Sequence, residues 1–547
     1  MTRKTKIILL LIILIAAFFR LLGLDWDQGQ HLHPDERFLT MVVSAMEVPK
    51  SLSDYLNPNI STMNPYNLNF SFFVYGTFPL FLTRIVGEII SKTDYWNIHL
   101  VGRFLSALFD LGTVFLLFKI GQKMFNEKSG LLAAFLYSIM VLPIQLSHFF
   151  AVDTFLNFFL ILSFFILLRI LSTRYHILDT ILLGFSFGCA LACKISALYF
   201  IPIIGLGYLY LIFPLKKITF IKLLKIFCSG IIFLLVSAIV YRLLQPSVFT
   251  TGNFLDWSIN PQFIKNIEEL KSYNTPDSWF PPAVQWHSAK PIIFPLKNMV
   301  LWGMGLPLGI ISLVSLFYSL FRRQKYSVFL AIFWILGLFI YQGVQFCTSM
   351  RYFLPIYPFL AILSAVFLSK LNKKFLILII ITSLIYPISF LSIYLHPITR
   401  VTASGWIYKN IPAGSTVTYE EWDDGLPLGL PNYPPANFKT ESLMMYEFDS
   451  VEKWQKINEK LAKVDYIFLT SNRAYGSTMK LPEKYPQTTK YYQDLFNGTG
   501  QFKKVAEFTS RPCFPPIGNH WFCFNDDNAE EAFTVYDHPK VMIFKKK

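Results

Sequence analysis

The sequence predicts an α-helical protein that crosses a membrane many times and carries a smaller soluble α/β domain at its C-terminal end. Of the 547 residues, 54% are hydrophobic and only 15% are charged, a composition typical of polytopic membrane proteins. Apolar runs of spanning length recur through residues 1–395, whereas residues 396–547 change to mixed polar sequence. The formal net charge of +15 does not indicate a nucleic-acid partner, because the basic residues form short clusters between apolar runs, as in cytoplasmic loops.

The first apolar run follows the basic start "MTRKTK". A secretory signal peptide begins in the same way, but no small-residue cleavage site follows this run. With a rise of about 1.5 Å per residue, Lys6–Leu24 covers roughly 28 Å, which is enough to cross the hydrocarbon core. We therefore expect this run to be retained as the first transmembrane helix.

Further apolar runs bring the expected number of transmembrane helices to about eleven. The runs begin near Lys6, Arg103, Leu131, Asp153, Ile177, Ile195, Ile226, Leu296, Ser327, Tyr352 and Phe375. A twelfth candidate, residues 70–90, is long enough to span but is interrupted by Gly76, Pro79, Arg84 and Glu88. We predict that this segment forms a helix lying in the membrane interface.

The positions of the basic loops favour eleven spans over twelve. With a cytoplasmic N-terminus, eleven spans leave nearly every short basic loop inside, including "FRRQK" and "KLNKK", whereas a twelfth span would turn them outward. The prediction is a multi-pass protein of the plasma (cytoplasmic) membrane with its N-terminus in the cytoplasm. The membrane domain is expected to cover residues 1–395, with extracytoplasmic loops 25–102 and 245–295, and residues 396–547 should form an extracytoplasmic domain.

The C-terminal segment alternates between helical and strand patterns. "GWIYKNIPAG" and "VEKWQKINEKLAKV" are typical of helices, and "STVTYEE" and "DYIFLTS" are typical of strands, which together predict one small α/β domain. Cys513 and Cys523 flank "FPPIGNHWF" in this segment. In an oxidising compartment they would pair across a short loop, and unpaired packing is the alternative.

The first outer loop concentrates titratable residues in "HLHPDERFLT". We predict that Asp35 is a general base, supported by Glu36, His33 and His148 and by Asp153 from the next outer turn. A carboxylate held partly out of water has a raised pKa and can accept a proton, and converging acids such as Asp35 and Asp153 can also hold a divalent cation, Mg²⁺ or Mn²⁺. The alternative is that the acid pair merely begins an interfacial helix and that Asp153 is a helix N-cap.

Three cations are expected at headgroup depth on the same face. Arg103 opens the second span, Lys194 lies in "ALACKISALYF", and Arg351 opens the tenth span in "SMRYFLPIYPF". Charged side chains within apolar stretches either snorkel to the interface or have a partner. Carboxylates facing outward above a ring of cations suggest a reaction between a soluble nucleophile and a lipid-borne phosphate.

In order and topology these features resemble the integral-membrane GT-C glycosyltransferases that use polyprenyl-phosphate sugars. The resemblance is strongest to the family 39 branch, which contains protein O-mannosyltransferases and bacterial aminoarabinose transferases. It covers essentially the whole membrane region and is carried by the acidic pair at Asp35, "RFLSALFDLGTVFLLF", "SHFFAVDTFLNFF", "LACKISAL" and "RYFLPIYPF". The C-terminal segment resembles the extra domain of some prokaryotic members.

The resemblance implies a role for each candidate residue. Asp35 would be the base, Asp153 would organise the site, and Glu36 would be the second acid of the pair. Substrate-binding residues would include the carrier-phosphate contacts and residues of the loop that closes over the substrates, a set that comprises His33, Arg103, His148, Lys194, Trp286, His287, Arg351 and Tyr352. Trp286 and His287 would equally suit interfacial aromatic anchors.

The expected function is therefore transfer of a hexose or pentose from a polyprenyl-phosphate donor to an acceptor hydroxyl on the extracytoplasmic face, with inversion. The acceptor would be a protein, a lipid or a glycan, and neither it nor the sugar can be identified from the sequence. A transporter or flippase for a lipid-linked glycan is the main alternative, although it should show inverted repeats or paired broken helices. A surface receptor or scaffold, or a polymerase or ligase of the same architecture, are further alternatives.

Overall fold

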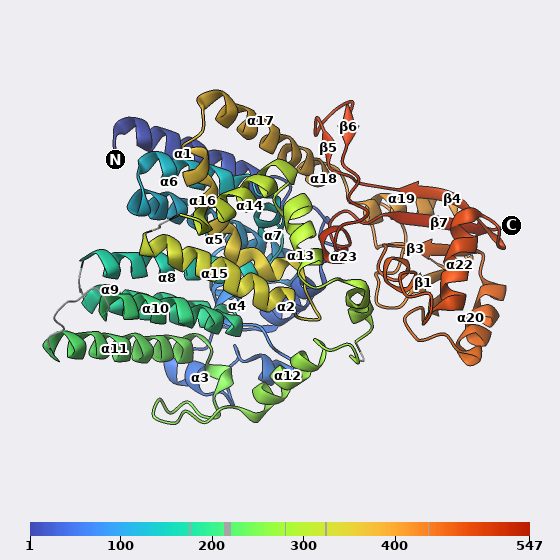
Figure 1. Ribbon diagram of the computed structural model, residues 1–547. Coiled ribbons are helices and arrows are strands. Elements are labelled where there is room, and N and C mark those ends of the chain that lie inside the picture. The colour runs from blue at the N-terminus through green and yellow to red at the C-terminus, as the bar shows by residue number, and fades with distance from the viewer. Residues whose placement is uncertain (174–176, 213–219, 279, 323–324, 436) are drawn as a thin grey trace.

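The computed structural model describes residues 1–173, 177–212, 220–278, 280–322, 325–435 and 437–547. It consists of a large helical body and a smaller α/β domain at one end of it (Figure 1). The N-terminus lies on the body at the end remote from the α/β domain, and the C-terminus lies on the domain.

Twelve helices make up the main part of the body. They are α1 (Arg3–Leu21), α5 (Tyr95–Met124), α6 (Glu127–Ser138), α7 (Val141–Ser147), α8 (Asp153–Thr173), α9 (Ile177–Cys193), α10 (Ile201–Ile212), α11 (Phe220–Leu244), α14 (Leu306–Leu320), α15 (Tyr326–Gly343), α16 (Tyr357–Leu368) and α17 (Lys373–Phe390). Shorter elements cover one end, namely α2 (Pro34–Ala45), α3 (Leu52–Leu56), α4 (Phe78–Ile89), α12 (Pro261–Ser272), α13 (Ile293–Asn298), α18 (Ser392–Leu395) and the 3₁₀ helices η4 (Pro281–Ser288) and η6 (Met350–Ile356).

Seven helical segments among the described residues are long and apolar enough to cross a membrane. The pair α6 and α7, bent by 62°, makes an eighth if it is counted as one span, and α9 and α14 are shorter apolar helices. Together with the 19-residue α1, these elements lie where the runs counted in the sequence begin. The multi-pass helical class is confirmed. The count of eleven is reached only if α1, the bent pair α6 and α7, α9 and α14 also span, so it stays a prediction.

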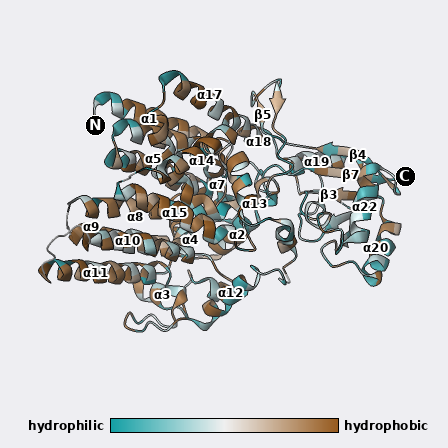
Figure 2. Ribbon diagram, in the orientation of Figure 1, coloured by the Kyte–Doolittle hydropathy of each residue, from teal (hydrophilic) through white to brown (hydrophobic). Residues whose placement is uncertain are grey.

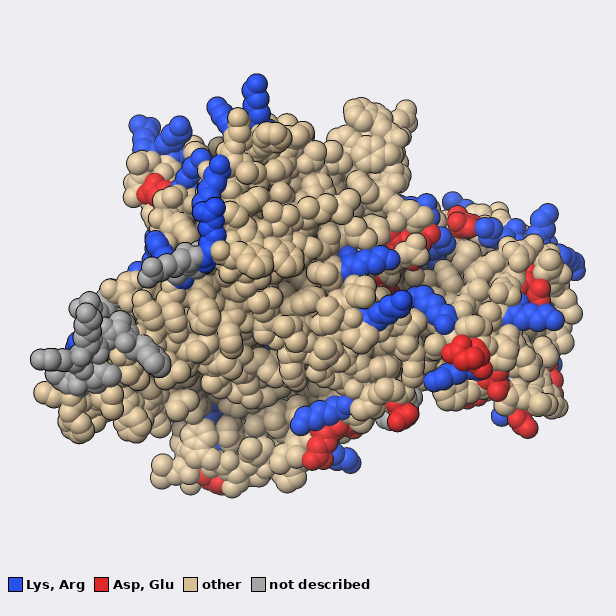
Figure 3. Space-filling view, in the orientation of Figure 1, with Lys and Arg blue, Asp and Glu red and all other residues tan. Residues whose placement is uncertain are grey.

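The surface of the body is that of a protein embedded in lipid. Apolar residues cover the helices (Figure 2), and on α11 the side chains of Phe220, Phe227 and Leu234 are exposed. Charged residues avoid the middle of the visible face and gather near the N-terminal end and over the α/β domain (Figure 3). Because exposed apolar area of this extent is unfavourable in water, the helical body requires a membrane.

Within the segment 70–90, only Phe78–Ile89 is helical. This helix, α4, has 12 residues and is therefore too short to span. It packs against α2, α5 and α9. Just before it, the backbone N–H of Gly76 donates to the carbonyl of Cys193 at 3.1 Å, and a Cβ at Gly76 would lie 2.1 Å from the Ala192 carbonyl oxygen. Glycine at this position therefore lets the first outer loop reach the end of α9, next to Lys194.

The C-terminal domain is built on a five-stranded mixed sheet. Its strand order is β2 (Lys439–Leu443), β1 (Thr416–Glu420), β3 (Tyr466–Leu469), β7 (Val541–Lys546) and β4 (Phe502–Phe508). β1 is parallel to β2 and β3, whereas β7 is antiparallel to β3 and β4. The helices α19 (Thr399–Asn410), α20 (Val451–Lys463) and α22 (Pro486–Asn497) complete the domain, so the α/β class predicted from the sequence is confirmed.

The sequence of α20 explains both where this helix begins and which of its faces packs on the sheet. Ser450 caps it by accepting a hydrogen bond from the backbone N–H of Lys453, and Ser is a favoured N-cap because it satisfies an otherwise unpaired donor. Trp454, Ile457 and Leu461 recur at helical spacing and are buried in a cluster shared with β3. One apolar face therefore docks the helix on the sheet.

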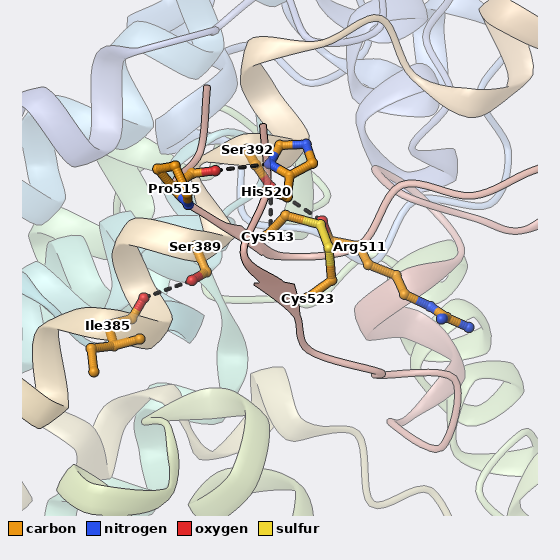
Figure 4. Close-up of a disulfide and its surroundings, with 8 residues drawn as sticks. All are labelled: Ile385, Ser389, Ser392, Arg511, Cys513, Pro515, His520 and Cys523. Carbon is orange, nitrogen blue, oxygen red and sulfur yellow. Dashed lines mark hydrogen bonds between the residues drawn. A yellow bond between two sulfur atoms is a disulfide. The ribbon is translucent and has the colours of Figure 1, made fainter. Parts of the chain in front are cut away.

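A disulfide joins Cys513 and Cys523, which pair across β5 (Cys513–Phe514) and β6 (Phe522–Cys523) (Figure 4). The hydroxyl of Ser392 accepts from the Cys513 N–H at 2.9 Å and donates to the Arg511 carbonyl at 3.1 Å. The hairpin is thereby attached to α18 at the end of the helical body. The disulfide restricts the conformations of this hairpin, whose two strands have only two residues each.

The polypeptide after this hairpin returns to the helical body before forming β7. Phe533, in α23 (Glu531–Thr534), is buried in the main core cluster of the body, and the side chain of Gln145 donates to the Phe533 carbonyl and to the Asp537 carboxylate. Tyr394 also donates to Asp537, at 2.8 Å. The last apolar helical segment, Lys373–Asn410, runs past the predicted boundary at residue 395, and residues of the 524–540 segment pack with the body, so the boundary stays a prediction.

Candidate active site

The first turn of α2 presents the two acids of the outer loop in different directions. His33 caps the helix, its ring nitrogen accepting from the Glu36 N–H at 3.3 Å, and Pro34 is the first helical residue, a position that suits proline. Consecutive residues on an α-helix point about 100° apart. Asp35 therefore faces Arg351, whereas Glu36 faces Arg103.

Asp35 forms an ion pair with Arg351, which lies near the start of η6. Both side chains are about one-quarter exposed, at 24% and 26%, and Tyr75 donates a further hydrogen bond to Asp35. Burial alone would raise the pKa of Asp35, but the Arg351 guanidinium outweighs it and the pKa lies below its usual value. The raised pKa expected from the sequence is therefore wrong for the resting site, because the nearest charge is a cation.

Asp153 forms a second ion pair, with Lys194 at 3.0 Å. Asp153 is the first residue of α8, where the helix dipole favours a carboxylate. The Lys194 ammonium lies 5.0 Å from the ring centroid of Tyr352, and the Arg351 guanidinium lies 5.5 Å from the same ring. Tyr352 therefore connects the two ion pairs into one group of two carboxylates, two cations and an aromatic ring.

Glu36 and Arg103 belong to a different cluster. Arg103 is fully buried and donates to both oxygens of Glu36, at 2.5 and 2.9 Å, and the nitrogen that makes the shorter contact also lies 3.0 Å from Asp27. Glu36 also accepts from the Phe150 N–H at 2.7 Å. As placed, Arg103 is paired with these carboxylates and Glu36 does not face the Asp35 group. Both hold α2 against α5, and the expected roles of Arg103 as a carrier-phosphate contact and of Glu36 as a catalytic acid stay predictions.

The two histidines predicted near Asp35 are also packed inside the protein. The His33 ring lies 4.3 Å from Tyr536 and 4.5 Å from Phe149, and burial lowers its pKa to about 4. His148 stacks on Tyr394 at 3.8 Å, and its two ring nitrogens contact the carbonyls of Ile144 and Leu22. His33 is thus neutral at physiological pH, and both side chains position loops instead of facing a cavity.

Trp286 and His287 lie on η4, in the second outer loop. Trp286 is buried against Phe294, and the His287 ring lies 5.2 Å from Phe346. His287 lines a cavity of about 910 Å³ between this loop and the α/β domain, with Trp422 and Tyr446 on the other side. Asp35 and Arg351 are not among the residues that line this cavity, so the two sites are separate.

Comparison with known proteins supports the fold. Residues 78–241 match the family model of dolichyl-phosphate-mannose-protein mannosyltransferases, whereas no curated protein matches the chain. The oligosaccharyltransferase of Archaeoglobus fulgidus, solved with Zn and sulfate, superposes with a TM-score of 0.53 at 16% identity, covering 96% of this chain and 74% of that one. The chain has the GT-C glycosyltransferase fold.

Two further solved structures show weaker similarity to this chain. ArnT from Cupriavidus metallidurans bound to undecaprenyl phosphate has a TM-score of 0.46 at 13% identity, covering 76% of this chain and 67% of that one. The S. cerevisiae Pmt1–Pmt2 complex bound to its sugar donor has a TM-score of 0.36 at 16% identity, covering 45% and 33%.

A metal shared by Asp35 and Asp153 does not fit this arrangement. Each carboxylate is already neutralised by a side-chain cation, Arg351 for Asp35 and Lys194 for Asp153. Within the described parts of the chain, neither belongs to a group of three or more His, Cys, Asp or Glu side chains whose ligand atoms converge. The residues present therefore do not fit the Mg²⁺ or Mn²⁺ expected at these two positions.

Two residues beside the candidate site come from the C-terminal segment, and no local pattern in the sequence pointed to them. Glu530 accepts from the Met350 N–H at 2.6 Å and from the Ser349 hydroxyl at 2.5 Å, which fixes the start of η6 directly before Arg351. Tyr536 packs on His33, the cap of α2. The segment thus touches both elements that carry the Asp35–Arg351 pair. Because Glu530 lies 180 residues from Met350, local patterns could not reveal the contact.

We expect Glu530 to make stability depend on pH. Burial raises its pKa from 4.5 to about 7, so between these values the folded chain holds a proton that the unfolded chain has released. The free energy of unfolding should fall as pH rises through this window, by on the order of 3 kcal/mol, and level off above it. Glu530→Gln should flatten this part of the decline, measured by thermal unfolding in detergent between pH 5 and pH 8. The exposed Glu459→Gln is the control, and an unchanged slope in Glu530→Gln would contradict the assignment.

Proposed function

We propose that this chain transfers a sugar from a polyprenyl-phosphate donor to an acceptor hydroxyl on the extracytoplasmic face of the membrane. The observation that carries the proposal is the group around Tyr352, in which Asp35 pairs with Arg351 and Asp153 pairs with Lys194. The cations supply charge for a phosphate, and a carboxylate in the same group can accept a proton. The match to a family model named for a dolichyl-phosphate-mannose donor supports this donor class.

The ion pair between Asp35 and Arg351 suggests how the base becomes active. In the resting site the guanidinium keeps the pKa of Asp35 low, and a carboxylate of low pKa is a weak base. When the donor phosphate binds Arg351, the guanidinium shares its charge with that anion and the basicity of Asp35 increases. Proton acceptance is thereby linked to the presence of the donor.

The proposed reaction then proceeds by direct displacement. The acceptor oxygen attacks the anomeric carbon, and its proton passes to Asp35 as the new carbon–oxygen bond forms. The bond from that carbon to the phosphate oxygen breaks, and its electron pair leaves with the lipid phosphate, which Arg351 and Lys194 stabilise. Attack opposite the departing phosphate inverts the anomeric centre, and no covalent glycosyl-enzyme forms.

A transporter or flippase is the competing proposal and would require paired broken helices. Within the described parts of the chain, α6 and α7 are the one pair of helices that is long and apolar enough to span together and is also sharply bent. This single feature does not favour transport over transfer.

The function is tested with the purified full chain reconstituted in lipid. It is incubated with a panel of polyprenyl-phosphate sugars together with peptide, lipid and glycan acceptors, and release of the lipid phosphate is followed by mass spectrometry. We expect one donor to release its phosphate in step with acceptor modification. Movement of intact donors across the bilayer without cleavage would establish transport instead, and no cleavage of any donor in the presence of all acceptor classes would refute the proposal.

The orientation proposed for the chain places its N-terminus in the cytoplasm and the α/β domain outside. Single cysteines at the exposed positions Asn59 and Ser450 should react with an impermeant thiol reagent in intact cells, and one at Arg322 should react only after lysis. The background variant replaces the free cysteines Cys189, Cys193, Cys228 and Cys347. Labelling of Asn59 and Ser450 from opposite sides would contradict the proposed topology.

A further inference from the structure

A second group of side chains converges where the first outer loop meets α5. Asp25 and Asp27 follow α1, and His99 lies in the second turn of α5. One ligand atom from each of the three lies within 4.8 Å of those of the other two. This is the only group of three or more His, Cys, Asp or Glu side chains with such geometry in the part of the chain that the structure describes.

Several polar atoms in this group are buried without hydrogen-bond partners. They are Oδ1 of Asp27 and both ring nitrogens of His99 and of the neighbouring His31. Asp27, His99 and His31 are 0%, 1% and 2% exposed. Leaving a buried polar group unpaired is unfavourable, and more so for a charged one, so five such atoms at one place indicate a missing partner.

The charges around the group suit a cation. Oδ2 of Asp27 is occupied by Arg103 at 3.0 Å and by the Leu32 N–H at 3.2 Å, which leaves Oδ1 free to coordinate. Asp25 and Asp27 lie at one place, where two carboxylates disfavour each other's charge. A bound cation would relieve this repulsion, and the exposed Asp25 leaves the group open to solvent.

His31 lies directly beside His99 and is buried. Neither of its ring nitrogens has a hydrogen-bond partner, so a ring nitrogen is available to coordinate a cation. Its ring lies 4.5 Å from that of His99 and 4.2 Å from that of Tyr95. His31 takes a positive φ of 52°, a conformation that non-glycine residues rarely adopt, and this places the side chain inward beside His99.

We propose that Asp25, Asp27 and His99 bind a divalent transition-metal ion, with His31 as an adjacent nitrogen donor. Mixed imidazole and carboxylate ligands favour Zn²⁺ and its neighbours over Mg²⁺ and Ca²⁺, which prefer oxygen alone. The ion is structural. It ties the loop after α1 to α5, and Asp27 connects it through Arg103 to Glu36 on α2, the helix that carries Asp35.

The test uses the full chain in detergent, purified through a tag without histidine, stripped with chelator and equilibrated with ZnCl₂. We expect close to one Zn²⁺ per chain by elemental analysis and a rise in thermal stability that MgCl₂ does not reproduce. Asp25→Asn and His99→Ala should each weaken zinc binding by about 100-fold or more, beyond the loss typical of supporting residues, and His31→Ala should weaken it less. The matched outer-loop control Asp54→Asn and the exposed His396→Ala should bind as the wild type does.

Two results would overturn the proposal. One is a wild-type chain that retains less than about one-tenth of an equivalent of Zn²⁺ and shows no zinc-dependent stabilisation. The other is an unchanged zinc affinity in Asp25→Asn, which has an exposed side chain and is expected to fold normally. Because neither readout is sugar transfer, failure here is distinguishable from failure of the proposed function.

Discussion

Asp35→Asn should lower turnover by about 10²- to 10⁴-fold, the contribution typical of positioned acid–base catalysis. Asparagine has nearly the same size, but it cannot take the proton of the acceptor hydroxyl. Because the substitution also frees Arg351 from its ion pair, donor affinity should be retained or increased. The measurement is release of lipid phosphate at saturating donor and acceptor, together with donor binding to the same preparation.

Two matched variants separate the base from its surroundings. Asp153→Asn should reduce turnover less than Asp35→Asn, because Asp153 orients Lys194 and does not accept the proton. Glu36→Gln should mainly lower stability, since Glu36 is buried against Arg103. If Asp35→Asn retains nearly wild-type turnover at saturation, Asp35 is not the base and the acid pair serves only to begin and fix α2.

Arg103→Met should destabilise the folded chain by about 3–5 kcal/mol, the cost typical of breaking a buried ion pair from one side. The substitution leaves Glu36 and Asp27, both completely buried, without their shared cation. Thermal or denaturant unfolding in detergent measures the loss. Arg511→Met is the matched control, because its pair with Asp527 is about one-third exposed and such pairs contribute at most about 1 kcal/mol.

The double variant Arg103→Met with Glu36→Gln tests the cause of this loss. Removing one of the uncompensated carboxylates should restore part of the stability, with a coupling of about 0.5–3 kcal/mol as expected for residues in contact. If Arg103 instead contacts the carrier phosphate, the single variant would keep its stability and lose donor affinity, and the structural role assigned here would be wrong.

Much of the fold was predictable because the signals that determine it are local. The length and apolarity of a segment decide whether it can span, and the described spans lie where those runs lie. In the C-terminal domain, the predicted helices and strands correspond to α19, α20, β1 and β3. The position of Asp35 in a loop between apolar helices also followed from the pattern of apolar runs, as did the presence of Lys194 and Arg351 at the ends of such runs.

The sequence by itself determined which charged residues lie at the ends of apolar runs, but not how they pair. Asp35 and Glu36 are neighbours in the chain, yet one pairs with Arg351, 316 residues away, and the other with Arg103, 67 residues away. Glu530 reaches the same site from the C-terminal segment. The direction of a pKa shift depends on the nearest charge and on burial, and only the tertiary structure sets these. For this reason the acid could be located from the sequence, whereas the low pKa of Asp35 and the structural role of Arg103 required the folded chain.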